Sequence, residues 1–210
     1  MENTATTPKK KSKVYSAQKI RKLTVTAILA AVSAVLMFLD FSVPFMPGFI
    51  KMDLSDMPAL IATFAFGPLS GVGVCLIKNL INLFTTTTGG VGEFSNFILG
   101  CMLVIPAGLI YKRKKSRKYA LLGSLVGAVC MAGMSFLTNY FIVYPIYTNF
   151  MPMEQIIAAY QAILPRVTAL WQALLIFNVP FTFIKGMLCA LVTFIVYKPL
   201  SPILKGKHNG

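Results

Sequence analysis

The chain has 210 residues, of which 56% are hydrophobic and only 12% are charged. Soluble domains carry about 25% charged residues, so this composition excludes an ordinary water-soluble protein. The formal net charge of +14 would suit nucleic-acid binding, but no aromatic or glycine-rich binding motif accompanies the basic residues. We therefore expect a lipid bilayer, and not a nucleic acid, around this chain.

Long apolar blocks predict six membrane-spanning helices. In chain order they cover residues 23–39, 54–66, 69–85, 94–111, 119–140 and 170–197. The second block is short for a full crossing, at roughly 20 Å of helix, and Gly67-Pro68 ends it. The outer connections include residues 40–56 and residues 144–166, and we expect an interfacial helix over 153–164.

The basic residues predict the orientation of these helices. Seven Lys and Arg precede the first block, six lie in residues 111–119 and three follow the last block. Loops rich in Lys and Arg stay on the cytoplasmic side. The fold class is therefore an all-α integral membrane protein with six transmembrane helices and both termini cytoplasmic. Residues 1–22 and 201–210 are expected to be cytoplasmic tails around a six-helix membrane domain, residues 23–200.

The last apolar block contains a lysine, in Pro180-Phe181-Thr182-Phe183-Ile184-Lys185-Gly186. A charge at membrane depth is costly unless it faces a cavity or a partner, and Pro180 frees a backbone carbonyl that needs a donor. Asn178, Thr182 and Lys185 are four and three residues apart, so they share one helix face. Snorkelling of Lys185 to the inner interface is disfavoured, because Tyr197 lies roughly 18 Å further along the helix. This face predicts a ligand pocket inside the bundle.

Other polar residues in or beside the apolar blocks have two readings each. Lys78 either pairs with a carboxylate such as Glu93 or reaches a ligand, and pairing is favoured. Glu93 and Asn96 begin the fourth helix at i and i+3, where an acid also suits the helix dipole. Asn139, near the outer end of the fifth helix, either contacts a planar heterocycle or caps the helix.

Small residues recur at helix-contact spacing on two helices. Ala27-x-x-x-Ala31 and Ala30-x-x-x-Ala34 lie on the first, and Gly123-x-x-x-Gly127 lies on the fifth. Such faces let helix backbones approach closely within a membrane. They fit packing inside the bundle or contact with another protein, and the spacing does not distinguish the two.

Motifs of catalysis and metal binding are missing from the sequence. It has no G-x-x-x-x-G-K-[ST] phosphate loop and no H-E-x-x-H zinc motif, and its single histidine is His208 in the tail. The four cysteines show no C-x-x-C spacing. The apolar blocks also lack the embedded carboxylates of a proton relay, which disfavours a proton-driven carrier. We expect a protein that is not an enzyme and holds neither a metal nor a cofactor.

Several short runs together resemble one family of transport proteins. They are residues 51–58, 66–71, 78–80, 92–97, 139–141 with 145–147, and 180–186. In this order and rough spacing they resemble the substrate-binding (S) components of energy-coupling-factor (ECF) vitamin transporters, in the riboflavin branch. The resemblance extends from residue 23 to residue 202.

The resemblance implies a six-helix monomer in a bacterial plasma membrane that captures riboflavin from outside. It implies a transmembrane coupling protein and two ATP-binding cassette ATPases as partners, which supply the energy. The small-residue motif that docks the coupling protein matches Ala27 and Ala31.

The resemblance also assigns binding residues. The family's ring-binding asparagine and lysine of the sixth helix match Thr182 and Lys185, and its helix-five asparagine matches Asn139. Asp53 and the surrounding loop, which includes Lys51, match the segment that closes the pocket from outside. Asn96, and with less support Lys78 and Glu93, complete the candidate substrate-binding set.

Threonine at position 182 is a departure from the family pattern. A hydroxyl donates and accepts single hydrogen bonds, but it lacks the paired edge of an amide, for which Asn178 one turn earlier is a candidate substitute. The main alternative is therefore an S component for another vitamin, with Thr182 marking the change. A self-sufficient secondary carrier is the second alternative.

Overall fold

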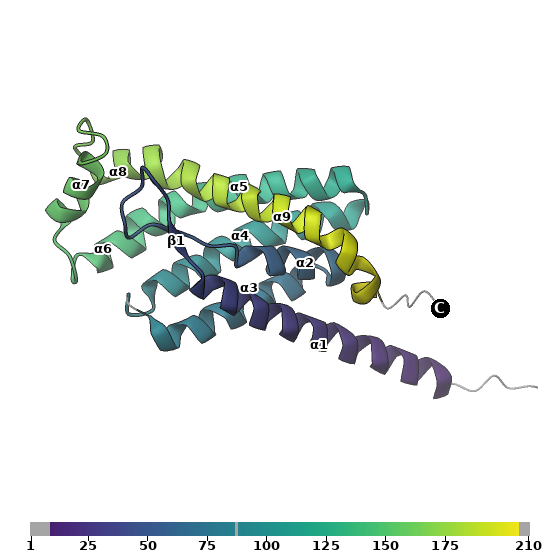
Figure 1. Cartoon of the computed structure of the whole chain (residues 1–210). Helices are drawn as coiled ribbons and strands as arrows, with labels where there is room; N and C mark the ends of the chain where they lie inside the picture. Colours follow the sequence, from purple (N-terminus) through teal and green to yellow (C-terminus); the bar gives the residue numbers. More distant parts are fainter. Residues whose placement is uncertain (1–8, 87, 206–210) are drawn as a thin grey trace, which may run out of the picture.

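A computed structural model describes residues 9–86 and 88–205. Its long helices form an elongated bundle (Figure 1). They are α1 (Lys9–Phe38), α2 (Asp56–Phe66), α3 (Pro68–Asn82), α4 (Val91–Arg113), α5 (Arg117–Thr138) and α9 (Val179–Lys205). The start of α1, the turn from α4 to α5 and the end of α9 lie at one end of the bundle (Figure 1). The segments with most of the Lys and Arg are thus brought together.

Short elements gather at the opposite end of the bundle (Figure 1). They are α6 (Tyr144–Tyr147), α7 (Met153–Gln161), α8 (Leu170–Ala173) and the single-turn helix η1 (Leu83–Thr85). A two-stranded antiparallel ribbon, β1 (Phe41–Ser42) with β2 (Lys51–Met52), lies in the loop between α1 and α2. The helix over 153–164 predicted from sequence is therefore present as α7, although it ends earlier.

Within the described residues, five helical stretches are long and apolar enough to cross a membrane. They are Ala17–Phe38, Pro68–Thr85, Val91–Arg113, Arg117–Tyr147 and Leu170–Leu200. The shorter apolar helix α2 corresponds to the second predicted block, residues 54–66. The all-helical membrane fold is confirmed, while the six crossings and the side of the termini stay predictions.

Two helices contain a single π-helical turn, which the sequence analysis did not predict. The turns are η2 (Asn139–Val143), which joins α5 to α6, and η3 (Leu174–Asn178), which joins α8 to α9. Each is followed two residues later by a proline, Pro145 or Pro180. Proline has no N–H and its ring crowds the preceding turn, and a wide turn relieves both problems. The helix predicted over residues 119–140 therefore continues to Tyr147.

The N-terminal end of the described chain is helical. Helix α1 begins at Lys9, well inside the stretch that was expected to be a tail. Residues 1–8 and 206–210 of the predicted tails, with His208, lie outside the described residues.

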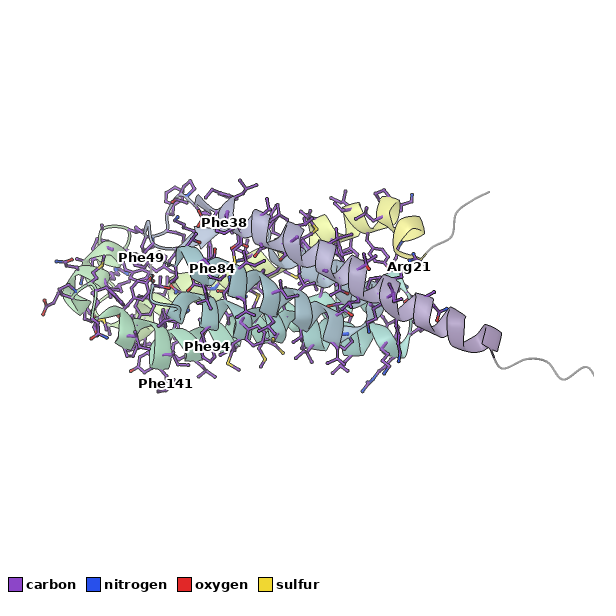
Figure 2. The ribbon with its side chains drawn as sticks, turned by 90° about the horizontal axis from the view of Figure 1, so that it is seen from below. Arg21, Phe38, Phe49, Phe84, Phe94 and Phe141 are labelled. Carbon is purple, nitrogen blue, oxygen red and sulfur yellow. The ribbon has the colours of Figure 1, made fainter. Side chains whose placement is uncertain are left out.

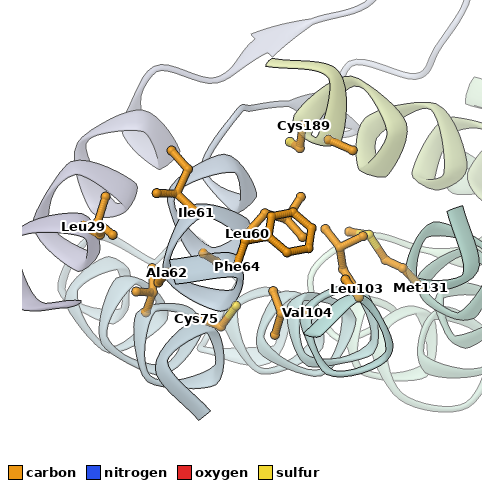
Figure 3. Packing of buried hydrophobic residues seen from close by; sticks show 14 of the residues in the cluster. Leu29, Leu60, Ile61, Ala62, Phe64, Cys75, Leu103, Val104, Met131 and Cys189 are labelled. Carbon is orange, nitrogen blue, oxygen red and sulfur yellow. The ribbon is translucent and has the colours of Figure 1, made fainter. Parts of the chain in front are cut away.

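The short helix α2 is the centre of the main hydrophobic core. Helices α1, α3, α4 and α9 all contact it, and Ala59, Leu60, Ile61 and Ala62 are buried in succession. Figure 3 shows these side chains among residues from the surrounding helices, such as Leu29, Val104 and Cys189. A helix that is apolar on every face is a buried helix, and the burial of most α2 residues agrees with this.

Small residues at close contacts now separate into two groups. A Cβ added to Gly127 would lie 2.3 Å from the carbonyl oxygen of Leu103, and one added to Gly123 would lie 2.7 Å from that of Ala107. These glycines therefore pack α5 against α4. On α1, Ala30 and Ala34 are buried whereas Ala27 and Ala31 are exposed. The two alanine pairs thus face in different directions. Only the pair Ala30 and Ala34 faces the protein interior.

Candidate ligand-binding site

A second hydrophobic cluster lies where the short elements gather. Its buried members include Tyr144, Ile156, Tyr160 and Leu174, and Phe49 from the loop between β1 and β2 packs against them. The labelled aromatic residues Phe38, Phe49, Phe84, Phe94 and Phe141 all lie in this half of the molecule, away from Arg21 (Figure 2). This end, predicted to be the outer one, is therefore rich in aromatic surface.

Lys185 is buried and paired with a carboxylate. Its Nζ donates to Asp53 Oδ2 at 2.6 Å, although the two residues are 132 positions apart in sequence. The other oxygen of Asp53 accepts from the backbone N–H and the hydroxyl of Ser55, at 2.8 and 2.5 Å. Burial alone would raise the pKa of the Asp53 carboxyl, but the charges of Lys185 and Lys78 hold that pKa well below its usual value.

Lys78 is fully buried and pairs with Asp56 at 2.5 Å, not with Glu93. Its Nζ also donates to the hydroxyl of Ser55 at 2.7 Å. The backbone oxygen of Ser55 in turn accepts from the hydroxyl of Ser33 on α1. The pairing role predicted for Lys78 is thus present with another partner, because the N-terminus of α2 lies alongside α3 and places Asp56 next to the lysine.

These bonds connect the loop before α2 to three helices at once. Asp53, Ser55 and Asp56 come from one short run, and their partners come from α1, α3 and α9. Charges taken out of water need good geometry and several hydrogen bonds to be tolerated. We call these six residues the buried charge network: Ser33, Asp53, Ser55, Asp56, Lys78 and Lys185.

Glu93 stabilises the loop between α3 and α4. Its carboxylate accepts from the amide of Asn82 at 3.2 Å and from the hydroxyls of Thr86 and Thr88 at 2.9 and 3.1 Å. No Lys or Arg pairs with Glu93 among the described residues. Glu93 also lines an open, mostly apolar groove between α3 and α4, together with Asn79 and Phe97.

Three of the predicted polar residues keep unused hydrogen-bonding groups. Asn178 is buried at the end of η3, Thr182 is buried one turn later on α9, and Asn139 is half-buried at the start of η2. Asn178 Oδ1 accepts from the hydroxyl of Tyr160 at 2.8 Å. Its amide also interacts with the hydroxyl of Tyr144, which leaves at least one amide N–H without a partner. Within residues 9–86 and 88–205, the structure shows no hydrogen bond from the Thr182 hydroxyl or the Asn139 amide to a protein group. None of the three side chains is among the fully enclosed atoms without a partner in the described residues, so a ligand or water can reach their free groups.

The two remaining candidates, Asn96 and Lys51, contact other residues. Asn96, half-buried on α4, has only a long contact of 3.8 Å from its amide nitrogen to Met37 Sδ. Lys51 is exposed on β2 and pairs with Asp40 at 3.1 Å. The structure therefore does not bring Lys51 together with the buried residues.

Four residues of the site were not singled out from the sequence: Ser33, Ser55, Asp56 and Tyr160. Asp56 had a signal, because two buried lysines need two carboxylates and Asp53 supplies only one. Tyr160 had no such signal, because its burial depends on how α7 folds back over the end of the bundle. Burial raises the pKa of Tyr160, so its hydroxyl stays protonated and able to donate.

The bundle thus carries a loop anchored by buried ion pairs, and polar side chains with free hydrogen-bonding groups below an aromatic-rich end. This architecture fits the class of multi-helix membrane proteins that can hold a small polar molecule. Comparison with known proteins makes the class specific. Residues 21–197 match the family described as "ECF transporter, substrate-specific component". The chain belongs to this family.

Relatives with curated names agree with this family. The riboflavin transporter RibU of Staphylococcus aureus (strain TCH60) is 33% identical over 188 residues, which cover 90% of this chain and 94% of the relative. The riboflavin transporter FmnP of Bacillus subtilis (strain 168) is 32% identical over 194 residues, covering 91% and 97%. The resemblance found in the sequence is thereby confirmed.

A solved structure agrees in fold. It is described as the S component of a bacterial ECF transporter, and it superposes with a TM-score of 0.71 at 32% identity. The match covers 89% of this chain and 99% of the solved chain.

Proposed function

We propose that this protein is the riboflavin-binding S component of an ECF transporter and captures riboflavin from outside the cell. The observation that carries the proposal is the family match over residues 21–197, together with relatives named riboflavin transporters. A flavin also suits the site, because it is a planar apolar ring with polar edges. Pockets that are mostly apolar with a few placed polar groups bind such ligands.

In this proposal, the polar groups without partners contact the ligand. The amide nitrogen of Asn178, the hydroxyl of Thr182 and the amide of Asn139 meet the ring edges. Lys185 uses one of its three N–H donors on Asp53, so donors remain for a ring oxygen. Asn96 and Glu93 lie on the α4 side of the site, and Lys78 acts through Asp56 and Ser55 on the loop that closes it.

The partners and location follow from the family. We infer that a transmembrane coupling protein and two ATP-binding cassette ATPases supply the energy, and that this subunit is not an enzyme. The exposed pair Ala27 and Ala31 on α1 offers the coupling protein a surface of small side chains. The protein is placed in a bacterial plasma membrane, with six crossings and both termini cytoplasmic.

The test is an absorbance spectrum of the detergent-purified protein, followed by a fluorescence-quench titration with riboflavin. We expect a flavin spectrum or tight, saturable quenching. Lys185→Ala should weaken binding at least tenfold, because it removes a donor and leaves Asp53 buried without its cation. Lys112→Ala, at an exposed lysine on α4, is the matched control. Unchanged riboflavin fluorescence with the wild-type protein would refute the proposal.

Thr182 supports a second candidate, an S component for another vitamin. The hydroxyl stands where the resemblance places an amide, so the hydrogen bonds offered to the ligand differ. A panel of vitamins in the same titration separates the two candidates. Tight binding of another vitamin, with none of riboflavin, would favour the second.

A further inference from the structure

The hydroxyl groups of two buried tyrosines form a chain that ends on the amide of Asn178. Tyr160 Oη donates to Asn178 Oδ1 at 2.8 Å, and Tyr144 Oη lies 2.5 Å from Tyr160 Oη. A tyrosine has one hydroxyl proton, and that of Tyr160 goes to the amide oxygen. Tyr144 must therefore donate to Tyr160, so the chain has one direction, from Tyr144 through Tyr160 to Asn178.

Separate segments of the protein hold this chain in place. Tyr160 is fully buried on α7, and its ring contacts those of Phe49 and Phe177, with centroids 5.8 and 5.3 Å away. Tyr144 is buried on α6 and meets Phe49 edge-on at 6.5 Å. Aromatic contacts of this kind restrict a ring to one position. The hydroxyl of Tyr160 is consequently fixed relative to α9.

A fixed hydroxyl decides which way the amide points. The oxygen and nitrogen of an amide exchange places when the group turns over. If Asn178 turned over, its nitrogen would donate to Tyr160, and Tyr160 would have to donate to Tyr144. The buried proton of Tyr144 would then lose its acceptor, which is unfavourable. The observed orientation leaves the two N–H donors of Asn178 directed away from Tyr160. The Asn178 amide also interacts with the hydroxyl of Tyr144, so at least one of its two N–H groups stays available to a ligand.

We propose that Tyr160, supported by Tyr144, is a positioning residue that makes Asn178 present its N–H groups, and not its oxygen, to the ligand. The site then selects at this point for a hydrogen-bond acceptor, such as a ring carbonyl of a flavin. This inference rests on the proposed function, because Asn178 is there a ligand contact. It also explains how the chain keeps an oriented amide one turn from Thr182.

The test uses the full-length protein in detergent and three ligands: riboflavin, 2-thioriboflavin and 4-thioriboflavin. In each thio analogue, sulfur replaces one ring carbonyl oxygen and is a weaker acceptor. Tyr160→Phe keeps the ring and its packing but removes the hydroxyl. We expect the wild type to bind one thio analogue more weakly than riboflavin. We expect Tyr160→Phe to bind riboflavin about 3- to 10-fold more weakly and to lose most of that preference.

Two further variants separate positioning from a general effect on structure. Tyr147→Phe is the matched control, because the hydroxyl of Tyr147, also on α6, makes no hydrogen bond within the described part of the chain. It should bind all three ligands as the wild type does. In an Asn178→Ala background, adding Tyr160→Phe should change nothing, because Tyr160 acts only through the amide.

Three results would overturn the inference. They are an unchanged thio preference in Tyr160→Phe, an equal loss of affinity when Asn178 is already alanine, and a loss of the same size in Tyr147→Phe. If Tyr160→Phe does not fold, as judged by its thermal unfolding, Tyr144→Phe tests the same chain, and an unchanged thio preference there overturns it equally. A wild-type protein that binds no riboflavin refutes the proposed function instead, before any variant is compared.

Discussion

The pair between Lys78 and Asp56 yields a prediction about stability. The Nζ of Lys78 lies 2.5 Å from Asp56 Oδ1 and 2.7 Å from the hydroxyl of Ser55, and both charged side chains are fully buried. The second oxygen of Asp56 has no hydrogen-bond partner among the described residues. Lys78→Met therefore leaves a buried carboxylate with neither a cation nor a strong donor.

Removing one partner of such a pair costs about 3–5 kcal/mol of unfolding free energy. For a protein of this size, 1 kcal/mol corresponds to about 2–4 °C in Tm, so we expect Tm to fall by about 6–20 °C. The assay is thermal unfolding in detergent at a fixed scan rate. Lys51→Met is the matched control, because the Lys51–Asp40 pair is exposed at 51% and 35% of its side chains, and exposed pairs contribute only about 0–1 kcal/mol.

A rescue variant sharpens the same experiment. Lys78→Met combined with Asp56→Ala removes both charges, and replacing a buried pair by apolar groups is often close to neutral. The double variant should therefore recover most of the lost Tm, although Asp56 also stabilises the first turn of α2 by about 0.3–1 kcal/mol. If Lys78→Met lowers Tm no more than Lys51→Met does, the reasoning about a buried charge is wrong.

Three other outcomes are expected from the packing, the exposed face of α1 and the low pKa of Asp53. Gly127→Ala should destabilise the protein by about 1–3 kcal/mol, because the new Cβ would lie 2.3 Å from a backbone oxygen. The control is Gly133→Ala on the same helix, whose Cβ would meet nothing within 4 Å and should leave Tm unchanged. Equal Tm values for the two variants would contradict the α4–α5 packing. Ala31→Trp should leave riboflavin binding by the purified subunit intact but abolish uptake in cells. Leu121→Trp, on the exposed face of α5, should leave both binding and uptake intact. Normal uptake by Ala31→Trp would exclude the exposed face of α1 as the docking surface. The pKa of Asp53 is lowered in the fold, so its contribution is present above the ordinary pKa of about 4 and is lost only as pH falls towards the folded value. The Tm difference between the wild type and Asp53→Asn should therefore be constant from pH 8 to pH 5, and a difference that shrinks within this range would show that Asp53 titrates there.

The helices of this protein could be predicted from the sequence, because in a bilayer each helix must satisfy its own backbone hydrogen bonds within a long apolar stretch. Five of the six predicted blocks correspond to helical stretches of membrane-spanning length. The remaining block, which forms α2, was already short in the sequence. Its position at the centre of the core depends on contacts with four other helices.

The π-helical turns show a signal that was present but incomplete. Pro145 and Pro180 each follow such a turn, and a proline within a helix always requires some adjustment. Yet Pro106 lies inside α4 without a π-helical turn. The kind of adjustment therefore depends on the neighbouring helices.

The sequence by itself determined that Lys185 and Lys78 need partners, because an unpaired charge in an apolar segment is too costly to keep. It also determined the family, through an ordered set of short runs spread over nearly the whole chain. Only the tertiary structure decided which carboxylate meets which lysine, since Asp53 reaches Lys185 across 132 residues. It alone placed Tyr160 against Asn178, because that contact depends on how α7 folds back over the bundle. Whether a lysine needs a partner depends on its own charge and on the apolar surroundings of its helix. Which carboxylate it meets depends on how distant segments of the chain pack together.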